Sequence, residues 1–165
     1  MGVKENRLVL KILYPENVTQ NYLGWMQDED ITQFMECRGK TYALVELKDY
    51  TRMVDESHND FLFGIYTSSD NVHIGNIKIG EINQLHKFGN LGLMIGEKKY
   101  WGKGYGTEAV KLATEYAFNK LHLNKLIAGI YGNNTSCYKA FLKAGYNKVG
   151  RLEKHRLHKA KYVDQ

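Results

Sequence analysis

The sequence predicts one α/β (α+β) domain built on a single mixed sheet. Its 165 residues suit one domain with a substantial core. Three β-rich runs, at residues 61–66, 72–82 and 90–96, follow one another with short polar connections and predict an antiparallel meander. Helix-like and strand-like segments alternate after it. The sequence contains no repeat or linker, so residues 1–165 are predicted to form the domain.

A strand and then mainly helical structure are expected before the meander. Residues 7–13 (RLVLKIL) form a compact apolar run that Pro15, the only proline, closes. A helix should follow, with Asn17 as its N-cap, because apolar residues recur at helical spacing through residues 18–26. Two further helices are expected, over residues 31–36 and 47–54.

Helix and strand alternate after the meander. Apolar residues form one stripe through residues 109–121, which predicts a strong helix. A strand is expected at residues 126–131, a capped helix at 133–145 that ends in a glycine, and a strand at 146–152. A last strand begins at residues 161–163.

The composition is that of a globular protein, with 43% apolar, 12% aromatic and 25% charged residues and no run long enough to span a membrane. The start of the chain lacks the pattern of a secretory signal, so a cytoplasmic location is expected. Cys37 and Cys137 lie far apart without CxxC spacing, which predicts neither a zinc site nor a disulfide. The net charge of +5 favours anionic ligands, and nucleic acid, acidic lipid and a phosphorylated cofactor all qualify.

The basic segment EKHRLHKAK contains His155 and His158 but offers no third metal ligand and no interleaved aromatic residues. A solvated basic segment is therefore predicted there. We expect no metal site, no nucleic-acid partner and no membrane partner.

The stretch YWGKGYGTEA places three glycines directly before a predicted helix. Gly102, Gly104 and Gly106 lack the Cβ atoms that would block an anion from the backbone N–H groups at the helix N-terminus. Lys103 adds positive charge and Thr107 adds a hydroxyl group. The glycines favour a phosphate site, although they also suit a tight strand-to-helix connection. The spacing fits neither a P-loop nor a Rossmann fingerprint.

Two motifs resemble those of the GNAT acyltransferases. The first is residues 101–106, which match the pyrophosphate loop Gln/Arg-x-x-Gly-x-Gly/Ala, and the second is the helix from Asn134 to the Gly145-Tyr146 pair. Their order and separation also fit the family, and the resemblance covers nearly the whole chain. Within the family, residues 21–38 are similar to the branch of ribosomal-protein alanine and amino-sugar N-acetyltransferases.

The resemblance implies a sheet with helices on both faces, in which the strand at 90–96 splays from the strand at 126–131. Acetyl-CoA would lie in the gap between these strands. Asn134 and Lys143 would contact the cofactor, although Asn134 also suits a helix cap and Lys143 a solvated lysine. The remaining cofactor contacts implied are Leu93, Met94, Ile95, Trp101, Gly102, Lys103, Gly104, Tyr105, Gly106 and Thr107.

Acetyl transfer needs a donor for the oxyanion and stabilisation of the departing thiolate. The backbone amide near Met94 is the expected oxyanion donor. The tyrosine that serves the family as general acid is replaced by Phe141. Tyr138, one turn earlier, or a water molecule could substitute, but a packing or surface role for Tyr138 also fits.

The general base and the acceptor contacts are less marked in the sequence. Glu81 is chosen as base over His86 and Glu97 because it lies late in the third expected strand, and a surface role remains its alternative. Trp25 and Arg38 fall in the segment that covers the acceptor site in the family. Arg38 would pair with an acidic group of the acceptor, whereas Trp25 also fits a core position.

The sequence thus predicts an enzyme that moves the acetyl group of acetyl-CoA to a primary amine by direct attack in a ternary complex. The first acceptor expected is an amino sugar, with a nucleotide-linked form included, and the second is a protein N-terminal amine. A catalytically inactive acyl-CoA-binding module is the alternative from another class, and a nucleic-acid-binding module is more distant. The protein is expected to be a monomer or a homodimer.

Overall fold

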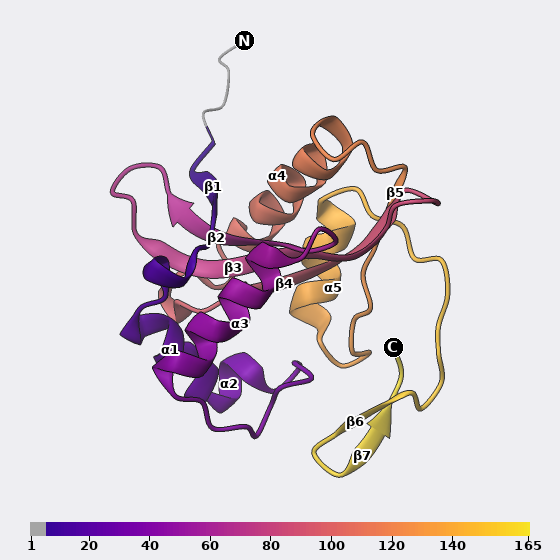
Figure 1. Ribbon diagram of the computed structural model, residues 1–165. Coiled ribbons are helices and arrows are strands. Elements are labelled where there is room, and N and C mark those ends of the chain that lie inside the picture. The colour runs from indigo at the N-terminus through magenta and orange to yellow at the C-terminus, as the bar shows by residue number, and fades with distance from the viewer. Residues whose placement is uncertain (1–5) are drawn as a thin grey trace.

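A five-stranded sheet forms the centre of the computed structural model, which describes residues 6–165 (Figure 1). Its strand order is β1-β2-β3-β4-β5; the first four are antiparallel neighbours and β5 runs parallel to β4. The fold class and the meander predicted from the sequence are therefore confirmed. The strands are β1 (Leu8–Ile12), β2 (Phe61–Thr67), β3 (His73–Asn83), β4 (Phe88–Ile95) and β5 (Lys125–Ile127).

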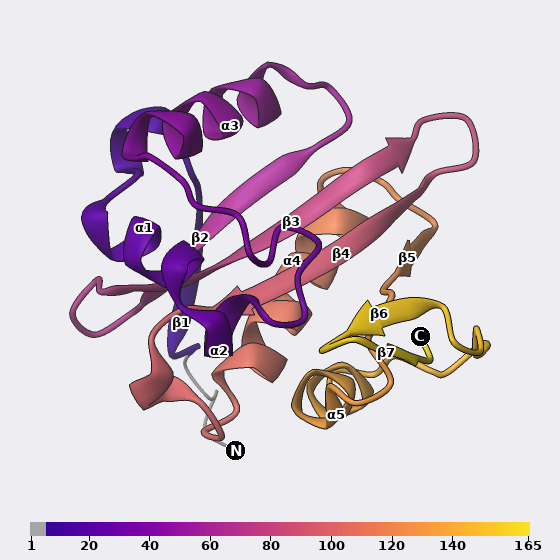
Figure 2. The same ribbon diagram turned by 90° about the horizontal axis from the view of Figure 1, so that it is seen from below.

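Helices cover both faces of this sheet (Figures 1 and 2). Alternation along β2 explains why both faces are apolar, since Leu62 points to one face and Phe63 to the other. The helices of the Leu62 face are α1 (Gln20–Gln27), α2 (Glu29–Thr32) and α3 (Leu44–Glu56). Those of the Phe63 face are α4 (Tyr105–Asn119) and α5 (Thr135–Lys143). None of the helices within residues 6–165 has both the length and the apolar character needed to cross a membrane.

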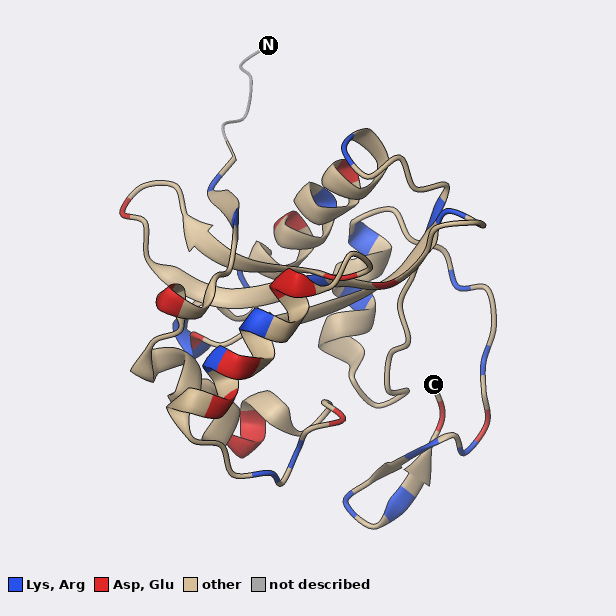
Figure 3. Ribbon diagram, in the orientation of Figure 1, with Lys and Arg blue, Asp and Glu red and all other residues tan. Residues whose placement is uncertain are grey.

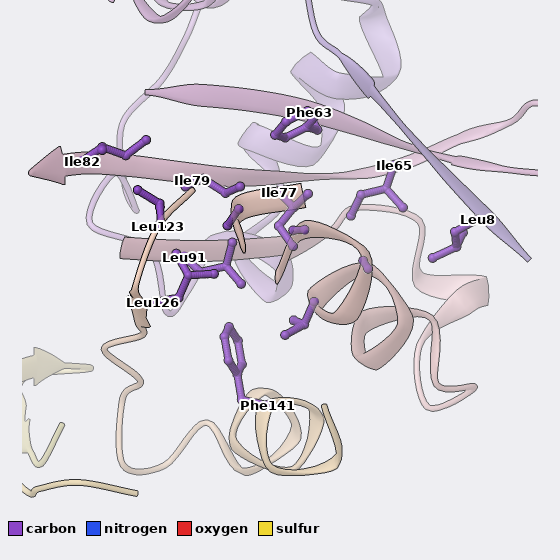
Figure 4. Close-up of a cluster of buried hydrophobic side chains, with 14 of the residues drawn as sticks. Leu8, Phe63, Ile65, Ile77, Ile79, Ile82, Leu91, Leu123, Leu126 and Phe141 are labelled. Atoms are coloured by element: carbon purple, nitrogen blue, oxygen red, sulfur yellow. The ribbon is translucent and has the colours of Figure 1, made fainter. Parts of the chain in front are cut away.

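The larger core lies between the sheet and α4. Ala109, Ala113 and Ala117 of α4 are fully buried, and these small side chains let the helix lie close to the strands. Phe141 points from α5 towards Leu91 of β4 and extends the same core (Figure 4). The core therefore fixes both helices that border the gap between β4 and β5.

The gap opens because β4 and β5 pair over only three residues. The paired residues of β4 are Phe88, Gly89 and Asn90, which face Lys125 to Ile127 of β5. Strand β5 ends at Ile127, earlier than the predicted end at residue 131, because the chain turns away from β4 there. The splay expected from the resemblance is present, and it leaves the edge of β4 from Leu91 to Ile95 without a strand partner in the described chain.

The strand predicted at residues 146–152 is wrong. Tyr146 packs edge-on against Phe141, with ring centroids 5.0 Å apart, and its hydroxyl forms a 2.9 Å hydrogen bond with the Thr114 hydroxyl. These contacts direct the chain onto the helices, and Val149 beyond them is 85% exposed. The chain then forms a separate hairpin from β6 (Arg156–His158) and β7 (Lys161–Val163), which includes the last predicted strand.

Two helix starts also differ from the sequence prediction. Thr19, and not Asn17, caps α1, because its Oγ1 accepts the N–H of Tyr22 at 3.4 Å. Asn17 lies in a short 3-10 turn, η1 (Pro15–Asn17), and accepts the N–H of Tyr14 instead. Asp28 caps α2 through the N–H of Asp30 at 2.9 Å, so this helix begins and ends earlier than residues 31–36. A second 3-10 turn, η2 (Lys98–Tyr100), leads into the glycine loop.

Candidate active site

The glycine loop, residues 101–107, forms the N-terminus of α4. Gly102 and Gly104 have φ angles of 71° and 84°, in the left-handed region that favours glycine. Gly104 is the N-cap of α4, and no side chain among the described residues forms a capping hydrogen bond with the first N–H groups of the helix. A Cβ at Gly106 would lie 3.2 Å from the Leu93 side chain, so this glycine lets α4 approach β4 closely. The loop therefore presents backbone donors at the positive end of a helix dipole.

Side chains around this loop hold it in place. The Trp101 indole donates to the Ile95 carbonyl at 2.8 Å and ties the loop to the end of β4. Arg7 pairs with Glu108 at 2.9 Å and lies over the Tyr105 ring, 4.2 Å from its centroid. Arg7 thus offsets the one acidic residue in the first turn of α4. Lys103 is exposed in the loop, and Thr107 is half-buried in the first turn of α4.

The exposed edge of β4 begins next to this loop. The Met94 carbonyl lies against Gly75 of β3, and Gly96 donates to the Ile74 carbonyl at 2.9 Å. Backbone groups alternate between the two edges of a strand, so Leu93 and Ile95 direct theirs to the open edge. Met94, predicted as the oxyanion donor, has its backbone on the paired edge of β4. The N–H groups of Leu93 and Ile95 are the ones that face the gap.

A cavity of about 490 Å³ passes through the gap between β4 and the chain after β5. Leu93 and Met94 line it from β4, and Phe141 and Asn134 line it from α5 and its cap. The rest of its wall comes from α1, α2, α3, the loop after α2, strands β2 and β3, and the chain after β5. The cavity therefore joins the open edge of β4 to the helices on the opposite face of the sheet.

A second cavity, of about 870 Å³, lies on the other side of α5. Its wall includes Tyr138, Tyr146 and residues 147–151, the segment that was expected to pair as a strand. It occupies the space beside β5 that such a strand would fill. Because the open edge of β4 does not line this cavity, the first cavity is the candidate site.

Residues of α5 have mixed roles. The Asn134 Oδ1 accepts the N–H of Cys137 at 3.2 Å, so Asn134 is a helix cap and at the same time lines the cavity. Lys143 is exposed at the other end of α5 and does not line the cavity. Tyr138 is 40% exposed and faces the second cavity, so the structure does not bring this acid candidate to the site. Burial raises the pKa of the Cys137 thiol to about 11, so this group stays protonated near neutral pH.

The structure does not place the predicted acceptor residues in the cavity wall. Trp25 is buried in the core, donates to the Glu97 carboxylate at 3.1 Å and packs against Gly96. Arg38 donates to the Tyr131 hydroxyl at 2.9 Å and to the carbonyl oxygens of Met35 and Leu157. Arg38 therefore ties the loop after α2 to the C-terminal hairpin.

The predicted base, Glu81, also lies outside the cavity wall. It sits at an irregularity between Gly80 and Asn83 of β3, with a φ of 52°, and its carboxylate is bonded to the Asn90 amide. Of its alternatives, Glu97 is bound to Trp25 and His86 is exposed in the hairpin loop. None of these three residues lines the cavity within the described chain.

Glu36 is the one carboxylate among the described residues that line the cavity, and the sequence analysis did not single it out. It accepts the Tyr131 hydroxyl at 3.0 Å and pairs with Arg156 of the hairpin at 2.8 Å. Figure 3 shows basic residues along the chain that leads to the hairpin. A signal was present, because Glu36 lies in the 21–38 segment that the resemblance places at the acceptor site.

The sequence predicts a solvated basic segment that contains His155 and His158, and this prediction is wrong for His158. His158 is buried, its ring stacks on Phe34 with centroids 4.8 Å apart, and its Nδ1 accepts the Asn133 amide at 2.9 Å. His155 is exposed. The hairpin is thus held against the loop after α2 through His158, Arg156 and the contacts of Arg38.

Comparisons with known proteins agree with this geometry. The sequence profile of the Acetyltransferase (GNAT) domain matches residues 7–147. The chain belongs to the GNAT acetyltransferase family. A probable N-acetyltransferase of Bacillus subtilis, YjcK, is 32% identical over 129 residues, which are 74% of this chain and 70% of that protein.

Two spermidine acetyltransferases are also similar to this GNAT chain. The spermidine N(1)-acetyltransferase of Escherichia coli is 32% identical over 112 residues, 67% of this chain and 58% of that protein. The crystal structure of spermidine N-acetyltransferase from Vibrio cholerae with CoA and spermine superposes with a TM-score of 0.86 and covers 97% of this chain and 92% of that one. At 19% identity, this likeness concerns the fold.

The GNAT chain is an acetyl-CoA-dependent N-acetyltransferase. Acetyl-CoA is its acetyl donor, and its own residues fit that role. The N-terminus of α4 offers N–H groups to a pyrophosphate, and the open edge of β4 offers Leu93 and Ile95 to an extended amide-bearing arm.

Proposed function

We propose that this N-acetyltransferase acetylates a primary amine of an aliphatic polyamine. The observation that carries the proposal is the Glu36 carboxylate in an otherwise mainly aromatic and apolar wall. Phe34, Tyr42 and Tyr50 contribute aromatic rings to this wall, and aromatic rings attract cations and pack against methylene groups. An acceptor with several ammonium groups along an alkyl chain matches both features. The names of the spermidine acetyltransferases with similar sequence and fold support the same class.

A nucleotide-linked amino sugar, the acceptor expected from the sequence, finds less support in the cavity. Its diphosphate would need a free cation. Lys78 is the one cation among the described lining residues, and it pairs with Asp60 at 2.8 Å through side chains that are 32% and 22% exposed. Glu36 is also paired, with Arg156, but its side chain is 69% exposed. Arg38 lies outside the wall, with its donors engaged by Tyr131 and by backbone carbonyls. A smaller amino sugar without phosphates remains a predicted acceptor.

Direct attack requires a neutral amine next to the thioester that acetyl-CoA supplies. The amine lone pair forms the new C–N bond, the C–S bond breaks, the thiolate leaves and the amine proton passes to solvent. The N–H groups of Leu93 and Ile95 lie where they can stabilise the oxygen that gains charge. Cys137, one of the two thiols in the wall, keeps its proton and is a poor nucleophile.

The acceptor panel that tests the proposal measures release of free CoA thiol from acetyl-CoA. Spermidine and spermine are compared with glucosamine, a UDP-linked amino sugar and peptides that begin with alanine. We expect release with the polyamines and at most weak release with the others. Release with only a sugar or peptide would contradict the polyamine assignment, and binding of acetyl-CoA without release to any amine would favour the non-catalytic alternative.

Replacement of Glu36 by glutamine should weaken polyamine binding. The Glu36 side chain is 69% exposed, so solvent screens its charge, and we expect the polyamine KM to rise about three- to tenfold. A monoamine has no second ammonium group, so its kinetics should change little. Steady-state kinetics with both amines measure this difference.

Two control variants separate the acceptor contact from other effects. The Arg156→Gln variant removes the partner of Glu36 in the hairpin and should not raise the polyamine KM. The Glu115→Gln variant neutralises an exposed carboxylate on α4. An equal KM increase in Glu36→Gln and Glu115→Gln would show that only overall charge matters.

A further inference from the structure

A partly buried histidine of β3 lies next to Asn76, a residue of the active-site cavity wall. His73 is stacked on Tyr66, with ring centroids 4.7 Å apart, and meets the Trp25 ring edge-on at 4.9 Å. Burial lowers its pKa, although its hydrogen bonds oppose that shift, so the ring is neutral near pH 7. The two aromatic neighbours fix the plane of the imidazole.

The hydrogen bonds of His73 determine its tautomer. Its Nε2 lies 2.8 Å from the Asn76 Oδ1 and 3.0 Å from the Gly75 carbonyl oxygen. A carbonyl oxygen only accepts, so Nε2 carries the proton and donates it. The Asn76 amide must then turn its oxygen towards His73. Its Nδ2 is directed away, and it has no hydrogen-bond partner within residues 6–165.

The free end of the Asn76 amide lies next to Tyr22. Both residues line the cavity, and they are only 5% and 4% exposed. Burial raises the pKa of the Tyr22 hydroxyl well above its ordinary value, and the Asn76 amide lowers it only in part. The hydroxyl therefore keeps its proton at any pH at which the enzyme works, and the Asn76 Nδ2 can donate a hydrogen bond but cannot accept one. The Tyr22 proton is free to be donated to a ligand.

Asn76 and Tyr22 lie beside the part of β4 that has the open edge. Asn76 is the register partner of Met94, so the two side chains lie on the same face of the sheet. Tyr22 belongs to the same buried cluster as Met94. The next residues of β4 on either side, Leu93 and Ile95, present the N–H groups of the open edge.

We propose that Tyr22 is a catalytic hydrogen-bond donor to the acetyl carbonyl oxygen, and that Asn76 and His73 position it. The attacking amine needs its lone pair for the new C–N bond, so a donor is of no use to it. The carbonyl oxygen gains negative charge as that bond forms, and it loses the charge when the C–S bond breaks. A neutral hydroxyl stabilises this charge without transferring a proton. Tyr22 thereby supplies a hydrogen-bond donor, which the Phe141 side chain lacks.

The direct test uses isotope-edited infrared spectroscopy of acetyl-CoA labelled with ¹³C at the carbonyl. Wild-type protein and the Tyr22→Phe variant are each saturated with it, in the absence of any amine. A hydrogen bond weakens the C=O bond, so the bound carbonyl should absorb at a lower frequency in the wild type than in Tyr22→Phe. Bands at the same frequency would overturn the proposal. This test does not depend on which amine is the acceptor, so it is separate from the polyamine proposal.

Kinetics provide a second test with any amine that the enzyme acetylates. Loss of one oxyanion donor should lower the kcat of Tyr22→Phe on the order of 10²-fold, with the KM of both substrates nearly unchanged. Tyr116→Phe, a matched change in α4 outside the cavity, should keep the wild-type kcat. A Tyr22→Phe kcat equal to that of Tyr116→Phe, or a fall in kcat accompanied by an equal rise in KM, would contradict the role.

Variants of His73 test the positioning step. His73→Phe keeps a ring between Tyr66 and Trp25 but removes the donor to Asn76, and we expect kcat to fall roughly tenfold. His73→Gln keeps an N–H donor and should recover much of that loss. If both variants retain the wild-type kcat, His73 is not needed to position Asn76. If kcat falls equally in both variants, the loss reflects packing and not the hydrogen bond. Either result would contradict the positioning role.

Discussion

Replacement of Gly104 by valine is expected to weaken acetyl-CoA binding by about ten- to a hundredfold. Gly104 has a φ of 84° as the N-cap of α4, and a β-branched residue pays about 1–2 kcal/mol there. The loop relieves this strain by shifting the first N–H groups of the helix. Loss of one hydrogen bond to a charged pyrophosphate is worth about 1.5–3 kcal/mol, which gives the expected change in affinity. Isothermal titration with CoA measures it.

A matched glycine outside the site provides the control. Gly150 lies in the irregular segment after α5, without a positive φ, and an added Cβ would meet nothing within 4 Å. Gly150→Val should bind CoA like the wild type. If Gly104→Val also retains wild-type affinity, the loop at 101–107 does not bind the pyrophosphate.

Replacement of Gly75 by alanine is expected to destabilise the protein by about 1–3 kcal/mol. The new Cβ would overlap the Met94 carbonyl oxygen and lie 2.9 Å from the Ile95 Cα. Both contacts are with backbone atoms, so β3 and β4 must separate. Because this pairing also sets which groups of β4 face the gap, CoA affinity should fall together with stability. Urea denaturation and CoA titration of the same variant measure the two effects.

Gly92 is the control for Gly75 because it lies in the partner strand. A Cβ at Gly92 meets nothing within 4 Å, so Gly92→Ala should unfold at the same or a slightly higher urea concentration. Equal stability of Gly75→Ala and wild type would mean that β3 and β4 are not packed as closely as described.

Much of the fold could be predicted from local sequence patterns. The meander was visible because its β-rich runs are separated by short polar turns, and α4 because one apolar stripe follows three glycines. The glycine loop was placed correctly at the helix N-terminus, where Gly102 and Gly104 need positive φ angles. The strand expected at 146–152 failed because Tyr146 packs on α5, a tertiary contact that no local pattern reveals.

The active-site residues were harder to predict because their roles depend on contacts between distant segments. Strand register, unknown from sequence alone, decides that Leu93 and Ile95, and not Met94, face the gap. Arg38 was predicted to contact the acceptor because of its place in the 21–38 segment. Its guanidinium instead donates to the Leu157 carbonyl oxygen of the hairpin, more than a hundred residues later in the chain. Glu36 can be recognised as a candidate only in the structure, where it is the carboxylate in a mainly aromatic and apolar cavity wall.

The measurement that tests the central claim most directly is a crystal structure of the protein with CoA and spermine. The account predicts that the pyrophosphate lies on the N–H groups at the start of α4 and that the pantetheine arm follows Leu93 and Ile95. The thiol should point into the 490 Å³ cavity, with the amine between Tyr22 and Glu36. CoA bound in the second cavity beside Tyr138, with the gap at β4 left open, would contradict it.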